Sequence, residues 1–273
     1  MRSSTISSLY QLSKPITAKD PFFTPFEFSI DFNILPQQLM LMLGAEPHPL
    51  CKTAATQLQV HLHTQQEWQH NFGLTTDPTE IIGKMFGVLV VETLQNEIGY
   101  LAAFSGKLAG GNHHAKFVPP VYDLLSPDGF LNHGMQKLTE LSQKIKELKE
   151  NKTDQEQLNL LQVARKKHSV TLQKEIFEHY HFLNQAGEEK SLNEIFKTAG
   201  YKNPPAGAGE CAGPKLLQYA FKHQMKPIAL AEFWWGQSPK SATWKHGHFY
   251  ACCKEKCEPI LAHMLSGIGN KAE

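Results

Sequence analysis

The spacing of hydrophobic residues changes several times along the chain, and each change marks a predicted element. Ala54, Leu58 and Leu62 recur every four residues, which predicts a helix over about 51–70. Two apolar runs that are typical of strands follow, and polar residues between them suit a hairpin loop. We therefore expect a helix and then a strand hairpin, with the strands over residues 83–92 and 98–104.

A heptad pattern replaces these strand-like runs in the middle of the chain. Four aliphatic residues between 138 and 148 follow heptad spacing with Lys and Glu between them, and a second helical run follows a polar break. The pattern predicts an antiparallel helical hairpin over 132–183 that is inserted into the main domain or projects from it. One hypothesis is an arm that grips a partner. The plainer one is two amphipathic helices that pack on each other and on the core.

The last third alternates between helix and strand signals. A Gly/Pro loop precedes a helix that begins near Cys211, a strand is expected over 227–235, and a final helix over 253–265. Helix, strand and helix in this order imply an α/β layer with strands near parallel.

These elements together predict the α/β (α+β) class, with a mixed sheet between helices. A segment rich in Phe and Pro reads as extended chain over residues 1–45, and its first 20 or so residues are expected to be loosely held. The α/β domain then comprises 46–131 and 184–273, with the helical hairpin of 132–183 inserted between its two parts.

Composition narrows the classes of partner. The chain has 273 residues, is 41% hydrophobic and carries a formal charge of +1, so no strong field favours a nucleic acid or a membrane. Its only arginines are Arg2 and Arg165, so any contact with phosphates would depend on lysine. The N-terminus has no apolar run typical of a signal peptide, and no stretch is long enough to span a bilayer. We expect a cytoplasmic protein with reduced thiols.

Clustered cysteines in such a setting indicate a metal site before they indicate disulfides. Cys211 precedes one predicted helix, and Cys253 and Cys257 lie one helical turn apart at the start of another. A lone thiol followed by a close pair can form one tetrahedral zinc site, with its thiolates stabilised at the helix N-termini. His248 is the predicted fourth ligand. The sequence leaves His246, Cys252 and water as alternatives, and it also leaves open that the thiols are buried apolar residues.

Two carboxylates and one aromatic loop lie beside these cysteines in the sequence. Glu210 and Glu232 are candidate general bases for a water on the metal. Glu232 falls inside an apolar strand, where an unpaired carboxylate would have a raised pKa, although pairing with a lysine such as Lys215 is the plainer interpretation.

The aromatic residues also allow a functional and a structural interpretation. Lys240, Trp244 and Lys245 are candidate contacts to RNA, because an aromatic ring beside lysines can stack on a base. Aromatic clusters in proteins more often belong to the core.

Several stretches of the chain resemble a known arrangement. They resemble the N-terminal extension of a subset of bacterial pseudouridine synthases, of the ribosomal large subunit pseudouridine synthase A type. The resemblance covers nearly the whole chain after residue 45. The stretches that show it are His48–Cys51, Glu67–Leu74, Ile82–Val91, Gly99–Leu108, Phe117–Val121, Phe182–Glu188, Pro204–Leu217, Ala231–Gly236 and the cysteine-containing C-terminal segment.

In that family the extension precedes a catalytic domain with a His-Arg-Leu-Asp motif, whose aspartate performs the chemistry. This chain contains no Arg-Leu-Asp, so isomerisation of uracil by this chain alone is not expected. The resemblance implies an accessory module that contacts RNA or the ribosome beside a pseudouridine synthase catalytic domain.

The order of elements around the cysteines is also similar to the zinc-dependent nucleoside and base deaminases. On that register Cys211 matches the first ligand, and Cys253 and Cys257 match the paired ligands. Gly213 occupies the place of the glutamate that shuttles protons, while Glu210 lies on the other side of the ligand. A zinc hydrolase that acts on a nucleobase or nucleoside is therefore the alternative function, and a protein-interaction module without metal or RNA is a third.

Overall fold

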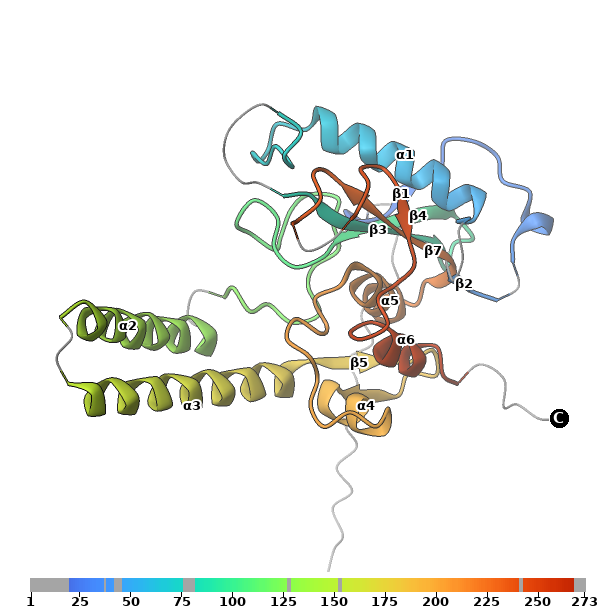
Figure 1. Cartoon of the computed structure of the whole chain (residues 1–273). Helices are drawn as coiled ribbons and strands as arrows, with labels where there is room; N and C mark the ends of the chain where they lie inside the picture. Colours follow the sequence, from blue (N-terminus) through green and yellow to red (C-terminus); the bar gives the residue numbers. More distant parts are fainter. Residues whose placement is uncertain are drawn as a thin grey trace, which may run out of the picture.

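The computed structural model describes residues 20–36, 38–41, 46–75, 82–126, 129–151, 154–240 and 243–267. Within these residues the chain forms six α-helices and eight strands, which confirms the predicted α/β (α+β) class. Figure 1 shows a sheet between helices and a pair of long helices that extends away from this core. The loosely held segment expected before residue 20 lies outside the described residues. None of the described helices has the length and the apolar character needed to cross a membrane.

The main sheet is mixed and has the strand order β1-β4-β3-β7-β2, with β8 paired to β7. Strand β3 pairs antiparallel with β4 and β7, and β2 pairs parallel with β7. The near-parallel arrangement expected for the last third is therefore wrong for the main pairings of β7, which are antiparallel with β3 and β8; among the described strands only the two-residue β2 pairs parallel with β7. The strands are β1 Thr24–Pro25, β2 Met40–Leu41, β3 Lys84–Glu92, β4 Ile98–Phe104, β7 Lys226–Trp235 and β8 Phe249–Tyr250.

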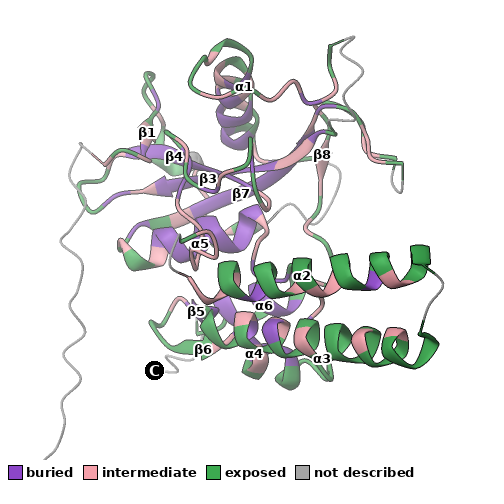
Figure 2. Cartoon of the chain, turned by 90° about the vertical axis from the view of Figure 1, so that its left-hand side faces the viewer, coloured by how far each residue is buried: buried purple, intermediate pink, exposed green. Residues whose placement is uncertain are grey.

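Alternating side chains of the central strands form a core on each face of this sheet. Phe86, Val88 and Val90 of β3 pack in the core beneath helix α1 (Pro49–Thr64). Leu89 and its equivalents on β4 and β7 pack in the opposite core, with α5 (Ala212–Lys222) and α6 (Glu258–Met264). Figure 2 shows the resulting layers, with buried strands between α1 on one side and α5 on the other. Successive residues of a strand therefore face opposite sides of the sheet, one toward α1 and the next toward α5.

The predicted helical hairpin forms and extends from the domain as an arm. It consists of α2 (Phe130–Asn151) and α3 (Gln155–His179), close to the predicted bounds of 132–183. The two helices meet where Gly134 faces Leu172, and the Arg165 Nε donates to the Ser142 Oγ at 2.8 Å. Most other side chains of the arm are exposed (Figure 2).

Short elements that the hydrophobic pattern did not predict lie at the base of the arm. Strand β5 (His181–Leu183) pairs with β6 (Glu189–Ser191), and α4 (Leu192–Thr198) follows. Ser191 and Glu194 form a capping box at the start of α4. A seven-residue helix shows too few periods for hydrophobic spacing to reveal it, so this capping box was its main sequence signal. The 3-10 helix Phe32–Ile34 in the N-terminal segment is shorter still.

The first turn of α5 lies very close to β3. A Cβ at Gly87 would stand 2.9 Å from the Ala212 Cβ and 3.0 Å from the Leu216 Cδ1. Distances this short leave no room for a side chain at position 87. The glycine thus sets the height of α5, and of its N-cap Cys211, above the sheet.

Replacing Gly87 with alanine is expected to destabilise the fold by about 1–3 kcal/mol, because the added methyl overpacks the α5 interface. Gly111→Ala is the matched control, since a Cβ there would find its nearest neighbour at 3.5 Å. Urea unfolding of both variants measures the difference. Equal unfolding free energies for the two variants would show that α5 can move away from the sheet at little cost.

Candidate metal centre

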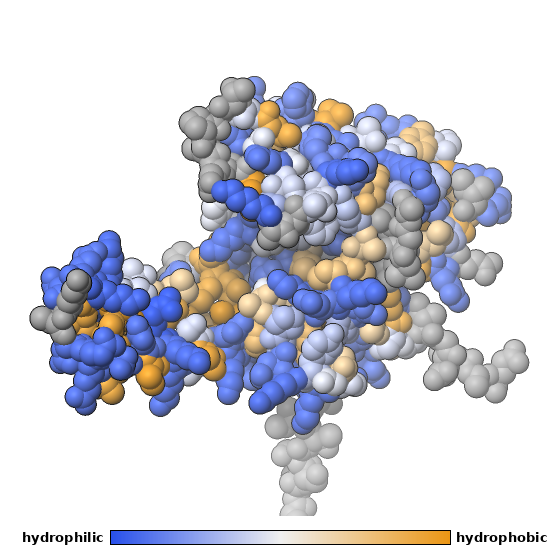
Figure 3. Space-filling view, viewed as in Figure 1, coloured by the Kyte–Doolittle hydropathy of each residue, from blue (hydrophilic) through white to orange (hydrophobic). Residues whose placement is uncertain are grey.

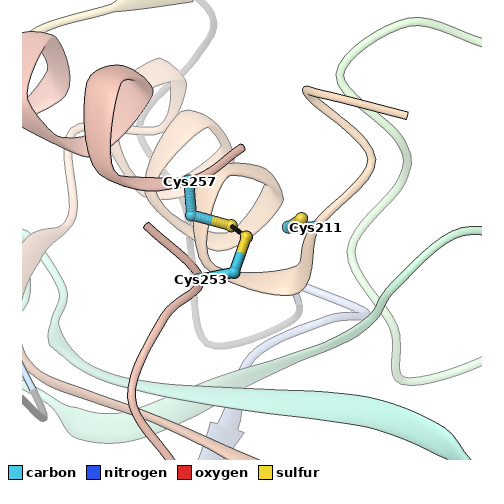
Figure 4. Close-up of side chains that lie close together, drawn as sticks. All are labelled: Cys211, Cys253 and Cys257. Carbon is cyan, nitrogen blue, oxygen red and sulfur yellow. Dashed lines mark hydrogen bonds between the residues drawn. The ribbon is translucent and has the colours of Figure 1, made fainter. Parts of the chain in front are cut away.

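Three cysteines from separate parts of the chain meet beside α5 and α6. Cys211 is the N-cap residue of α5, Cys257 is the N-cap residue of α6, and Cys253 lies in the turn before α6. Their sulfur atoms all lie within 4.8 Å of one another, and the Cys253 and Cys257 sulfurs are 3.4 Å apart. Figure 4 shows the three side chains converging. The structure therefore brings together the three cysteines that the sequence predicted, in a group that can hold a metal ion.

The final helix begins later than predicted, at Glu258 instead of Cys253. Pro259 explains this start, because proline has no backbone N–H and is favoured in the first helical turn. The Cys257 N still donates to the Cys253 O at 3.2 Å, so the preceding segment closes as a single turn. The two sulfurs are consequently adjacent although they do not share a helix face.

The thiols of the group share negative charge unequally. Hydrogen bonds from Cys211 and Cys257 lower the pKa of Cys253 to about 2. Hydrogen bonding within the group raises the pKa of Cys211 and of Cys257, and burial raises both further. Without a cation the group favours one thiolate, so a metal ion is needed to bring all three to the charged form.

The predicted fourth ligand, His248, is not part of this group. Its side chain is exposed, while its backbone O accepts from the Trp234 N at 2.9 Å in the β7–β8 connection. The alternative His246 accepts at Nδ1 from the Gly236 N at 2.9 Å, and its ring lies 4.2 Å from that of Trp235. Cys252 also stays outside the group. Among the described residues, the group therefore supplies three candidate ligands.

Glu232 lies beneath the first turn of α5, close to the metal ligands. Its Oε1 accepts from the Gly213 N at 2.9 Å, two residues after Cys211, and its side chain is buried. Burial raises the pKa of Glu232 to about 7; the hydrogen bond from the Gly213 N–H partly offsets this effect, and the charge of Cys253 adds to it. The carboxyl group thus lies beside the residue that the deaminase resemblance places in the shuttle position.

Lys215 does not pair with Glu232, contrary to the plainer interpretation of the sequence. Its Nζ donates to the Phe104 O at 3.1 Å and to the Gly106 O at 3.3 Å, and lies 3.9 Å from the Glu210 Oε2. Burial raises the pKa of Glu210, and Lys215 partly offsets this effect. The alternation of side chains along β7 indicates that Glu232 faces α5. Glu232 is two residues from Leu230, which packs in the core beside α5, so the two side chains lie on the same face of the sheet.

The predicted RNA contacts lie in one loop between β7 and β8. Lys240 and Lys245 are exposed there. The Trp244 ring stacks on Trp234 at 5.4 Å and meets the edge of Tyr250 at 4.5 Å. Trp244 is half-buried by these contacts, so packing is its main role, and less of its ring is available for a base than the sequence suggested.

Sequence reasoning did not identify a second group of lysines, at the base of the arm. Lys174 of α3, Lys197 of α4 and Lys202 line a cleft there together with Tyr201. These residues are scattered over 29 positions of the sequence and form no motif. Only the packing of α3 against α4 brings them together.

Comparison with known proteins gives no relative for this chain: no protein-family model, no curated protein and no solved structure matches it.

The raised pKa of Glu232 predicts how the stability of the metal-free protein depends on pH. The folded state holds this proton up to about pH 7, whereas the unfolded chain releases it near the ordinary value of 4.5. Stability should therefore fall between these pH values, by on the order of 3 kcal/mol. Glu232→Gln keeps an acceptor for the Gly213 N–H and should remove this fall.

Urea unfolding between pH 4.5 and 8 with a chelator present tests the effect. The exposed Glu140→Gln on α2 is the control and should follow the wild-type profile. A Glu232→Gln profile parallel to wild type at every pH would mean that this carboxyl is ionised in the fold.

Proposed function

We propose that this chain is a zinc-stabilised accessory module for RNA modification, which contacts RNA or the ribosome beside a pseudouridine synthase catalytic domain. The convergence of Cys211, Cys253 and Cys257 is the observation that supports it most. The absence of an Arg-Leu-Asp sequence argues against a role as the isomerase itself.

The donor set suits zinc. Thiolate sulfur favours zinc over magnesium or calcium, and a tetrahedral zinc with bonds of about 2.3 Å holds its sulfurs about 3.8 Å apart. One sulfur pair in the structure is 3.4 Å apart, and all lie within 4.8 Å, so small side-chain rotations suffice. The ion would also neutralise the negative charge of three thiolates, which the metal-free group does not carry.

A zinc ion at this point would join α5 to α6 across the long connection that contains β7 and β8. The free energy of metal binding would then contribute to the stability of this half of the fold. The ion would also fix the C-terminal end of the loop that precedes Cys211. This role requires no reaction, which suits an accessory module.

Contact with RNA is supported by exposed cations in two places. Lys240 and Lys245 are exposed in the β7–β8 loop beside the packed Trp244. The arm extends from the domain (Figure 1), and Arg165, Lys166 and Lys167 of α3 are exposed on it. Point charges of this kind bind phosphate backbones with little sequence preference, which suits a module that positions an RNA.

Glu232 supports one alternative, a zinc-dependent hydrolase of a nucleobase or nucleoside. Three protein ligands and an open fourth position are typical of catalytic zinc, which supplies a nucleophilic water. Glu232, held by the Gly213 N–H beside Cys211, would hold and release the proton at its carboxylate. Glu210 is less suited to this role, because Lys215 lies beside its carboxylate.

Protein purified without chelator should contain about one zinc per chain, measured by atomic emission. Cys211→Ala, Cys253→Ala and Cys257→Ala should each lose most of this metal, because two thiolates bind zinc weakly. Cys252→Ala is the matched control and should retain it. Metal-free protein with an unchanged melting temperature in all four variants would contradict the proposal.

Single-stranded RNA should bind the chain with an affinity that falls steeply as salt rises, since each lysine contact releases counterions from the RNA. Lys240→Gln/Lys245→Gln should reduce the slope of log K against log salt by about 1.4, which corresponds to two lost contacts. Fluorescence anisotropy measures both quantities. An undetectable or salt-independent affinity would count against the RNA role.

The hydrolase alternative predicts release of ammonia from a cytosine or adenine compound by the zinc-loaded chain. Glu232→Gln should abolish this activity while the zinc content stays the same, and Glu210→Gln should retain most of it. A coupled ammonia assay over a panel of bases and nucleosides tests this. No release by fully zinc-loaded protein would exclude the alternative for that panel.

A further inference from the structure

A cleft of about 500 Å³ lies at the base of the arm, away from the cysteine group. One wall belongs to the last turns of α3, and the other belongs to α4 and the segment that follows it. Its volume falls in the range of small-ligand sites in proteins. Neither the metal centre nor the β7–β8 loop uses the residues that line this cleft.

The cleft carries excess positive charge. Lys174, Lys197 and Lys202 line it, and none of them belongs to an ion pair among the described residues. Glu178 is the one carboxylate among the lining residues, and its Oε1 already accepts from the Asn193 Nδ2 at 2.7 Å. Three ammonium groups around one cleft attract an anion with several charges, such as consecutive phosphates.

Tyr201 presents an aromatic surface at the same cleft. Tyr201 is 42% exposed. The fully buried Phe196 contacts it edge-on at 5.4 Å, and the Tyr201 N donates to the Phe196 O at 2.9 Å. A ring fixed in this way is a platform on which an unpaired base can stack at little entropic cost.

The outward face of α3 extends this surface along the arm. Lys167 and Lys174 are two helical turns apart on one face, and Val163 and Val170 are exposed on the same side. Figure 3 shows apolar residues between hydrophilic ones on the arm. An RNA strand that leaves the cleft along α3 would meet further positive charge.

We propose that this cleft binds single-stranded RNA, with lysines at successive phosphates and one base stacked on Tyr201. A single strand fits better than a duplex, because stacking on Tyr201 needs a base that is already unpaired. The inference rests on the proposed role in RNA modification and gives the RNA contact a location separate from Lys240 and Lys245.

Anisotropy titrations of the full chain with a labelled 12-nucleotide RNA of mixed sequence test the location. Lys197→Gln/Lys202→Gln should reduce the salt slope by about 1.4. The matched control Lys144→Gln/Lys149→Gln removes two exposed lysines of α2 and should leave the slope unchanged. Tyr201→Ala should weaken binding by roughly 5- to 150-fold, whereas Tyr201→Phe keeps the ring and should stay within about twofold of wild type.

The outcomes separate this inference from the broader proposal. If wild type binds RNA and only the Lys240→Gln/Lys245→Gln variant binds it more weakly, the cleft is not the RNA site, and the proposed role in RNA binding stands. If wild type binds no RNA, both are overturned. If a poly-glutamate peptide binds the cleft more tightly than RNA does, the partner is an acidic protein segment and the inference is wrong.

Discussion

Helix α5 packs so closely on strand β3 that residue 87 has room for a hydrogen atom and nothing larger. This close contact fixes the height of the helix, and the N-cap position of Cys211 then fixes where its sulfur lies. It also places the Gly213 N–H 2.9 Å from the carboxylate of Glu232 on the neighbouring strand. The position of the first candidate metal ligand and the hydrogen bond of the nearest buried acid thus both depend on one packing contact.

The metal centre and the cleft at the base of the arm share a loop. Pro204 lines the cleft, and Cys211 lies seven residues further along the same connection. Gly209 in this connection packs on the ring of Tyr180, where α3 ends. A metal ion that fixes Cys211 would therefore also hold one wall of the cleft. A structural metal and a binding surface can then belong to one mechanism, in which the ion orders the surface.

Elements with several periods of hydrophobic spacing were predictable from the sequence, and so was the meeting of the cysteines. The strand hairpin, the helical arm and the helix after Cys211 follow their predicted bounds within a few residues. Partners set by packing were not predictable: Lys215 neighbours Glu210 instead of Glu232, and His248 lies outside the cysteine group. Short elements such as α4 have too few periods for hydrophobic spacing to reveal them. A cleft whose lysines are distant in sequence depends on tertiary contacts that no local pattern encodes.

X-ray absorption at the zinc edge would show whether the three cysteine thiolates bind a zinc ion together with one further ligand. We expect three sulfur neighbours at about 2.3 Å and one lighter nitrogen or oxygen neighbour at about 2.0 Å. Four sulfur neighbours would mean that Cys252 completes a closed structural site. A shell of nitrogen and oxygen alone, or no bound zinc, would show that the three cysteines do not form a zinc site.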